Sequence, residues 1–64
     1  MVTDEMRTKW KQRTEFCKKH LNKLDEWSLG FIDSIDKQLG EGKDLSLKQS
    51  FKLSEIYHGV EDRL

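Results

Sequence analysis

A cysteine and a histidine three residues apart are the first side chains in this sequence whose types and spacing could do chemistry. Cys17 and His20 have C-x-x-H spacing, which a helix would place on adjacent turns, and His58 is the other histidine. A thiol beside an imidazole can act as a nucleophile with its base, and the three side chains together could ligate a metal. A structural zinc site normally has four ligands, and the chain has no fourth Cys or His. We therefore expect no metal and no cofactor.

The segment GEGK, residues 40–43, is the one glycine-containing stretch that could be compared with a phosphate-binding loop. It lacks the length of a P-loop, and no strand precedes it. A helical chain of 64 residues also has little room for a pocket that excludes water and stabilises an oxyanion. These observations predict that the protein is not an enzyme.

Charge is divided unevenly along the chain, although the whole is neutral. Residues 1–24 carry seven Lys or Arg and three acidic side chains, a net charge of +4. Residues 25–64 carry five Lys or Arg and nine acidic side chains, a net charge of −4. In one interpretation the two parts of the chain face each other and neutralise through surface ion pairs. In the other, the basic part contacts nucleic acid.

The nucleic-acid interpretation depends on five basic side chains. Three of them fall within about 40° of one another on a helix that begins near the N-terminus. Two others lie near the start of a later helix, where they could reach phosphates or base edges. The connection before that helix is longer than the usual turn of a helix-turn-helix, and several acidic residues lie near it. The set is Arg7, Lys11, Lys18, Lys48 and Lys52.

Aromatic side chains are numerous for so short a chain, which has two Trp, three Phe and one Tyr. Some of them could simply form the core. Because Trp and Tyr are favoured anchors at protein interfaces, a surplus of aromatic surface also favours a partner-binding role. The three aromatic side chains that we expect to anchor a protein partner are Trp10, Phe16 and Tyr57.

Three helices are predicted to position these side chains. The chain has no proline, 38% charged residues and no alternating run of Val, Ile and Thr, a composition that favours helices over strands. The first helix spans about residues 4–22, with Thr3 as its N-cap. Its apolar residues fall within about 60° of one another, and Arg13 occupies a vacant step of that face. This apolar face consists of Met6, Trp10, Cys17, Leu21 and Leu24.

The other two helices are predicted from their capping residues. Asp25 caps a helix over about residues 26–39, and Gly40 supplies the left-handed residue that ends it. Ser46 and Gln49 form an S-x-x-Q capping box that begins a helix over about residues 47–58. Gly59 is the expected stop of that last helix. The apolar side chains that this helix carries are Leu47, Phe51, Leu53, Ile56 and Tyr57.

The fold class is therefore all-α, a single small three-helix domain over residues 1–64 in which the second and third helices form a hairpin. A compact bundle is favoured over an open form in which the first two helices are nearly continuous. A domain of this size without a disulfide has marginal stability, so a homodimer is a further alternative. No apolar run approaches the length of a membrane span, and no signal peptide is evident, so we expect no membrane contact and a cytoplasmic location.

Residues 27–57 carry a pattern of a Trp, then FI-x-SI-x-x-QL, a glycine-containing break, LS-x-KQ and L-x-x-IY. This pattern resembles a short helical module of phage and bacterial DNA-processing proteins, and nothing before Asp25 matches it. The resemblance implies an accessory element beside replication, repair or recombination machinery, located in the host cytoplasm if a phage encodes it. The matching residues are Trp27, Phe31, Ile32, Ser34, Ile35, Gln38, Leu39, Gly42, Leu45, Ser46, Lys48, Gln49, Leu53, Ile56 and Tyr57.

Taken together, these features predict a non-enzymatic helical accessory protein that binds a larger protein partner in nucleic-acid processing or host takeover. One alternative is a protein that binds DNA or RNA directly through its basic first helix. The other alternative is a structural protein that associates with itself.

Overall fold

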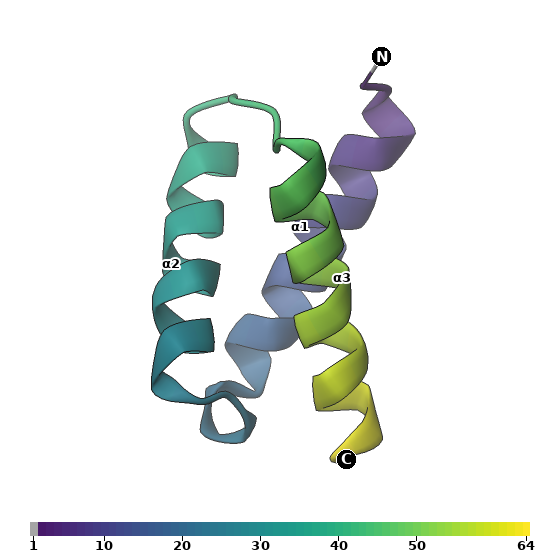
Figure 1. Ribbon diagram of the computed structural model, residues 1–64. Coiled ribbons are helices and arrows are strands. Elements are labelled where there is room, and N and C mark those ends of the chain that lie inside the picture. Colours follow the sequence, from purple (N-terminus) through teal and green to yellow (C-terminus); the bar gives the residue numbers. More distant parts are fainter. Residues whose placement is uncertain (1) are drawn as a thin grey trace.

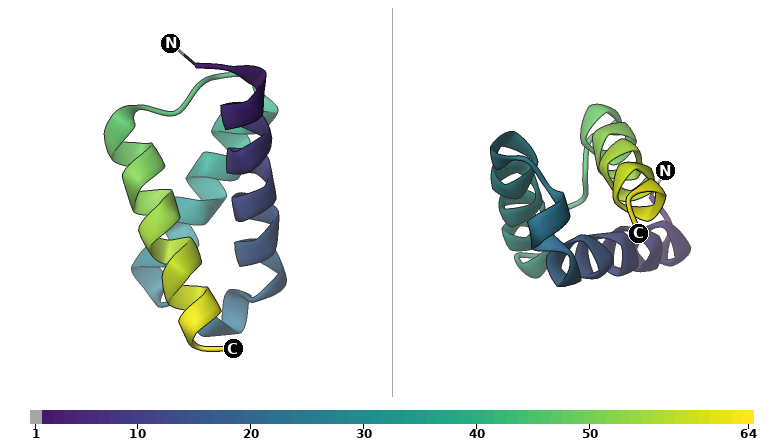
Figure 2. Two further views of the ribbon diagram at one scale, coloured as in Figure 1. Left: turned by 90° about the vertical axis from the view of Figure 1, so that its right-hand side faces the viewer. Right: turned by 90° about the horizontal axis from the view of Figure 1, so that it is seen from below.

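Three α-helices joined by short connections make up the computed structural model, which describes residues 2–64 (Figure 1). They are α1 (Asp4–Lys19), α2 (Glu26–Gly40) and α3 (Leu47–Asp62), with a short 3₁₀ helix (Leu21–Lys23) between α1 and α2. The helix α1 packs against both of the others, whereas α2 and α3 contact each other least (Figure 2). The predicted all-α class and the hairpin of α2 and α3 are confirmed, in the compact form.

Each helix begins at the residue that the sequence predicts, because a side-chain oxygen accepts a bond from an amide that has no partner within the helix. The Thr3 hydroxyl accepts from the amide of Met6 at 3.2 Å, and the Asp25 carboxylate accepts from the amide of Ser28 at 2.8 Å. The capping box at the start of α3 is complete in both directions. The Gln49 amide donates to the Ser46 hydroxyl at 3.2 Å, and the Ser46 amide donates to the Gln49 side chain at 2.9 Å.

The ends of the helices differ from the predictions. The first helix stops at Lys19 rather than near residue 22, because His20 leaves helical geometry and the chain tightens into the 3₁₀ helix. Gly40 stays inside α2, and it is Gly42 that has a positive φ of 79° and reverses the chain. Gly59 does not stop α3 either. The helix continues to Asp62, which allows Val60 to be fully buried.

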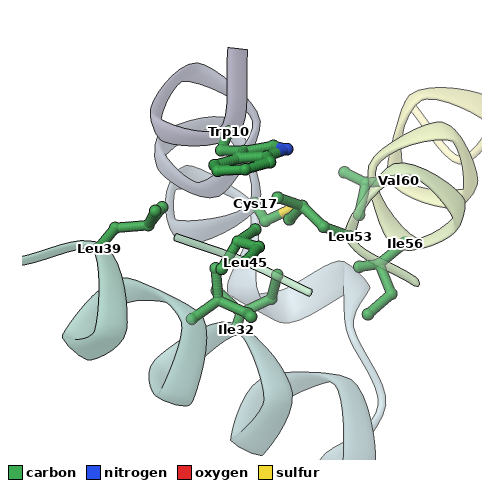
Figure 3. Packing of buried hydrophobic residues seen from close by; sticks show 9 residues of the cluster. Trp10, Cys17, Ile32, Leu39, Leu45, Leu53, Ile56 and Val60 are labelled. Atoms are coloured by element: carbon green, nitrogen blue, oxygen red, sulfur yellow. The ribbon is translucent and has the colours of Figure 1, made fainter. Parts of the chain in front are cut away.

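The core lies between the three helices and draws on all of them (Figure 3). Its side chains are Trp10, Cys17, Ile32, Ile35, Leu39, Leu45, Leu53, Ile56 and Val60. In α1 the buried positions are Trp10, Thr14 and Cys17. The Thr14 hydroxyl donates to the Trp10 carbonyl at 2.8 Å, which satisfies it and lets a polar residue occupy the core.

The prediction of which residues form the apolar face of α1 is therefore partly wrong. Met6 and Leu21 are exposed, and Leu24 is half-buried. Thr14, which was not expected, lies in the middle of the buried stripe, and Arg13 lies half-buried beside it. The stripe is centred on the line from Trp10 to Cys17, and Leu21 falls beyond the end of the helix that carries it.

A polar network holds the connection between α2 and α3. The side-chain amides of Gln38 and Gln49 bond to each other in both directions, at 2.9 and 3.2 Å. Gln38 also donates to the Asp44 carbonyl at 2.8 Å. The Asp44 carboxylate in turn accepts two hydrogen bonds from the guanidinium of Arg7, at 2.8 and 3.3 Å. The connection is thus bonded to α1 as well as to the two helices that it joins.

Candidate partner-binding surfaces

Trp10 lies in the core rather than on the surface. Its side chain is 3% exposed, and its indole N–H donates to the Ser50 hydroxyl of α3 at 3.2 Å. An anchor must be accessible to its partner, so the prediction that Trp10 anchors a partner is wrong for this structure. Its position in the middle of the α1 stripe explains the burial, because that stripe faces both of the other helices.

The other two predicted anchors come together from opposite ends of the chain. Phe16 of α1 and Tyr57 of α3 are both half-buried, and their rings meet edge to face with centroids 5.0 Å apart. The Phe16 ring also lies 4.8 Å from the ring of His20. This edge-to-face geometry is favourable for aromatic pairs and fixes the orientation of both rings.

A shallow groove of about 300 Å³ runs along this aromatic pair, and we call it the α1–α3 groove. It is lined by Lys9, Gln12, Arg13, Phe16 and Tyr57. Two of these side chains are cationic and none is acidic. The Arg13 guanidinium lies 5.4 Å from the centroid of the Tyr57 ring, a cation–π arrangement. Within residues 2–64, neither Lys9 nor Arg13 has an acidic side chain within ion-pair distance.

Two of the basic residues predicted to contact nucleic acid are paired with acids from the later part of the chain. Arg7 contacts Asp44 at 2.8 Å, and Lys18 contacts Asp36 at 3.3 Å. The hydrogen bond to Asp44 raises the pKa of Arg7, and the same bond lowers the pKa of Asp44. The bond to Asp36 likewise raises the pKa of Lys18. At these two sites the oppositely charged parts of the chain do face each other, as the first interpretation of the charge pattern expects.

The remaining basic residues of that set are spread over different faces. Lys11 is exposed on α1, and Lys48 is exposed on α3. Lys52 pairs with Glu55 at 3.6 Å and lies over the Trp27 ring, 4.9 Å from its centroid. The five side chains therefore do not form one continuous basic surface.

Sequence reasoning missed a second exposed surface on α2 and α3. Trp27 is 60% exposed and stacks on Phe31 with centroids 5.4 Å apart. On α3, Leu47 is 72% exposed and Phe51 is 66% exposed, although Phe51 was one of the aromatic side chains that could form the core. A helical wheel contains the signal, because Phe51 stands about 180° from the mean direction of the buried residues of α3.

The cysteine and histidines do not form a reactive site. Cys17 is completely buried, and this burial raises the pKa of its thiol, which suppresses the reactive thiolate. His58 is exposed and contacts Glu61 at 3.2 Å. Across residues 2–64, no group of three or more His, Cys, Asp or Glu side chains is arranged to hold a metal ion.

None of the helices that the structure describes combines the length and apolar character needed to cross a membrane. Comparison of the chain with protein-family models, with curated proteins and with solved structures gave no match. The surfaces described above are therefore the basis for inferring function.

Proposed function

We propose that this protein is a small non-enzymatic accessory protein that binds an acidic segment of a larger protein through the α1–α3 groove. The observation that carries the proposal is the meeting of two half-buried aromatic rings, Phe16 and Tyr57, with two cations, Lys9 and Arg13. Among residues 2–64, neither cation has an acidic side chain within ion-pair distance. Each feature alone is common on protein surfaces. Together they provide both an apolar contact and a charge preference.

The aromatic pair supplies the apolar part of the contact. Tyr57 is held by Phe16 on one side and by the Arg13 guanidinium on another, so little side-chain freedom remains to be lost on binding. Aromatic and Arg side chains dominate the energetics of many interfaces. The aromatic ones bury a large area with few rotatable bonds, and Arg offers a planar guanidinium with several hydrogen-bond donors. A partner segment with an apolar side chain beside carboxylates would match this groove.

The cations supply specificity. A carboxylate from the partner can form a bidentate pair with Arg13, and a second can approach Lys9. Such charges act mainly on the rate and selectivity of association, whereas the aromatic contact acts on the lifetime of the complex. The resemblance of residues 27–57 to a module of DNA-processing proteins supports a search for the partner among nucleic-acid-processing proteins.

Protein is favoured over nucleic acid as the occupant. Binding to a nucleic acid gains most of its affinity from several simultaneous phosphate contacts. Arg7 and Lys18 already contact carboxylates. The other three basic residues of the set, Lys11, Lys48 and Lys52, are not among the residues that line the groove. Two cations remain at the groove, which suits a short acidic segment better than a phosphate backbone.

The test is a titration of the isotope-labelled full chain, followed by NMR, with short peptides that combine acidic and aromatic residues. We expect signals of residues that line the groove to shift, and equivalent peptides with Lys in place of the acidic residues to bind at least about tenfold more weakly. Reversal of both groove cations (K9E/R13E) should abolish the preference. The matched control reverses Lys19 and Lys23, which lie outside the groove lining.

Two results would reject the proposal. One is an absence of peptide-induced shifts at the groove in the folded protein. The other is tight, steeply salt-dependent binding of single- or double-stranded DNA that the K9E/R13E variant loses, which would assign the groove to nucleic acid instead.

A further inference from the structure

The outer side of α3 carries an apolar pair that the fold leaves uncovered. Leu47 and Phe51 are one helical turn apart, so their side chains lie on the same face, and they are 72% and 66% exposed. That face points away from the buried stripe of Leu53, Ile56 and Val60.

The neighbouring Trp27 differs from this pair in that two other side chains contact its ring, although it is itself 60% exposed. Phe31 stacks on the Trp27 ring with an interplanar angle of 10°, and Lys52 lies over the ring at 4.9 Å. Phe51 has no aromatic or cation–π contact within residues 2–64. Within the described residues, Phe51 therefore lacks the ring contacts that Trp27 has.

Charges beside this pair are arranged so that the surface complements itself. Lys48 and Glu55 lie in one row along the same edge of the face, within about 20° of each other. They are seven residues apart, which is about 10 Å along the helix axis, and Phe51 lies midway between them. If a second α3 helix packs antiparallel with its two-fold axis near Phe51, Lys48 of each copy is placed opposite Glu55 of the other.

We infer that this face binds a second copy of the chain, forming an antiparallel α3–α3 homodimer with the two Phe51 rings near the axis. The inference is independent of the proposed function, because the α1–α3 groove lies on another side of α3. The choice of a second copy rests on the charge pattern. Lys48, which has no acidic side chain within ion-pair distance in residues 2–64, and Glu55, which contacts Lys52 of its own chain at 3.6 Å, lie on opposite sides of Phe51 along the helix axis. Two large apolar side chains per copy make a small interface, so the dimer is expected to dissociate in the micromolar-to-millimolar range.

The test is sedimentation equilibrium of the full chain over a wide range of concentration. The wild-type protein should show a reversible monomer–dimer equilibrium. The L47S/F51S variant should be monomeric throughout, and because both side chains are exposed it should keep its helical circular dichroism spectrum. The matched control is L21S, which removes an exposed leucine outside this face and should leave the dimer unchanged.

Charge reversal identifies the geometry of the dimer. K48E alone places like charges across the axis, as does E55K alone, and each should weaken self-association by about tenfold. An equimolar mixture of the K48E and E55K chains should restore association as a heterodimer. The K48E chain is then acidic at both positions and the E55K chain is basic at both, so opposite charges face each other across the axis. The K19E variant controls for the change in net charge.

A protein that remains monomeric at all concentrations would overturn the inference. So would a dimer that survives L47S/F51S, since its interface would lie elsewhere. Failure of the K48E and E55K chains to associate on mixing would overturn the antiparallel arrangement. None of these results depends on whether acidic peptides bind the α1–α3 groove.

Discussion

Replacement of Gln49 by alanine is expected to lower the free energy of unfolding by about 2 kcal/mol. The side chain takes part in three hydrogen bonds, one with the Ser46 amide and two with the side chain of Gln38. The bond to the Ser46 amide is half of a capping box, and loss of a cap costs about 1 kcal/mol. The two bonds to Gln38 are partly solvated and contribute about 0.5 kcal/mol each.

This loss is large for a domain of this size. A 64-residue chain at the usual stability per residue has about 3–10 kcal/mol in total. A loss of about 2 kcal/mol therefore removes a substantial fraction of it and should lower Tm by about 10 °C. Urea unfolding monitored by far-UV circular dichroism measures the change, and an unchanged m-value would show that the compactness of the two states is preserved.

Gln49→Glu is the matched control. A carboxylate at this position still accepts from the Ser46 amide, and it can still accept from the side-chain amide of Gln38. It loses only the bond that Gln49 donates to Gln38, so the cost should be about 0.5 kcal/mol. A Gln49→Ala variant that loses less than about 0.5 kcal/mol, or a Gln49→Glu variant that is as unstable as the alanine variant, would refute this account of the network.

Three further predictions concern the connection and the core. Asp44→Asn should make the free energy of unfolding depend less on pH in the acidic range. Because Arg7 lowers the pKa of Asp44, this carboxylate stabilises the fold above its unfolded pKa and ceases to do so as the pH falls through its folded pKa. Urea unfolding at a series of pH values checks this, and an unchanged profile contradicts it. Gly42→Ala should destabilise the fold by about 1 kcal/mol because Gly42 has a positive φ, whereas Gly30→Ala, at an exposed position in the middle of α2, should stabilise it by about 0.5–1 kcal/mol. Thermal unfolding in which both variants shift Tm in the same direction would contradict the different backbone roles of the two glycines. Cys17 should react with a thiol reagent only as fast as the protein unfolds, so added urea should accelerate labelling, and rapid labelling of the native protein would show that the core is open.

Helix starts were predicted more accurately than helix ends, and the reason lies in the side chains. Thr3, Asp25 and Ser46 each carry an oxygen that satisfies a nearby amide, so the start is a local event that the sequence displays. The ends depend on tertiary packing. Beyond its own turn of the helix, a Cβ atom at Gly59 would meet no other atom within 4 Å, and Gly59 has no positive φ. The helix α3 therefore continues through Gly59 and buries Val60.

The candidate sites show the same division. The pairing of Phe16 with Tyr57 joins residues far apart in the sequence, and a chain read alone indicates only that both are aromatic. Trp10 was predicted to anchor a partner and is buried, whereas Phe51, which could have formed the core, is exposed. Their positions depend on which stripe of each helix faces its neighbours, and a stripe is defined by several residues together rather than by one residue type.

The central position of α1 has a consequence for how the protein is made. Trp10 and Cys17 belong to a core that α3 shares, and because α3 is synthesised after α1 and α2, that core stays incomplete until α3 has been made. A nascent chain that ends before α3 therefore exposes the indole and the thiol of α1 to the surroundings of the ribosome. We therefore expect the domain to acquire its native structure only after translation of α3.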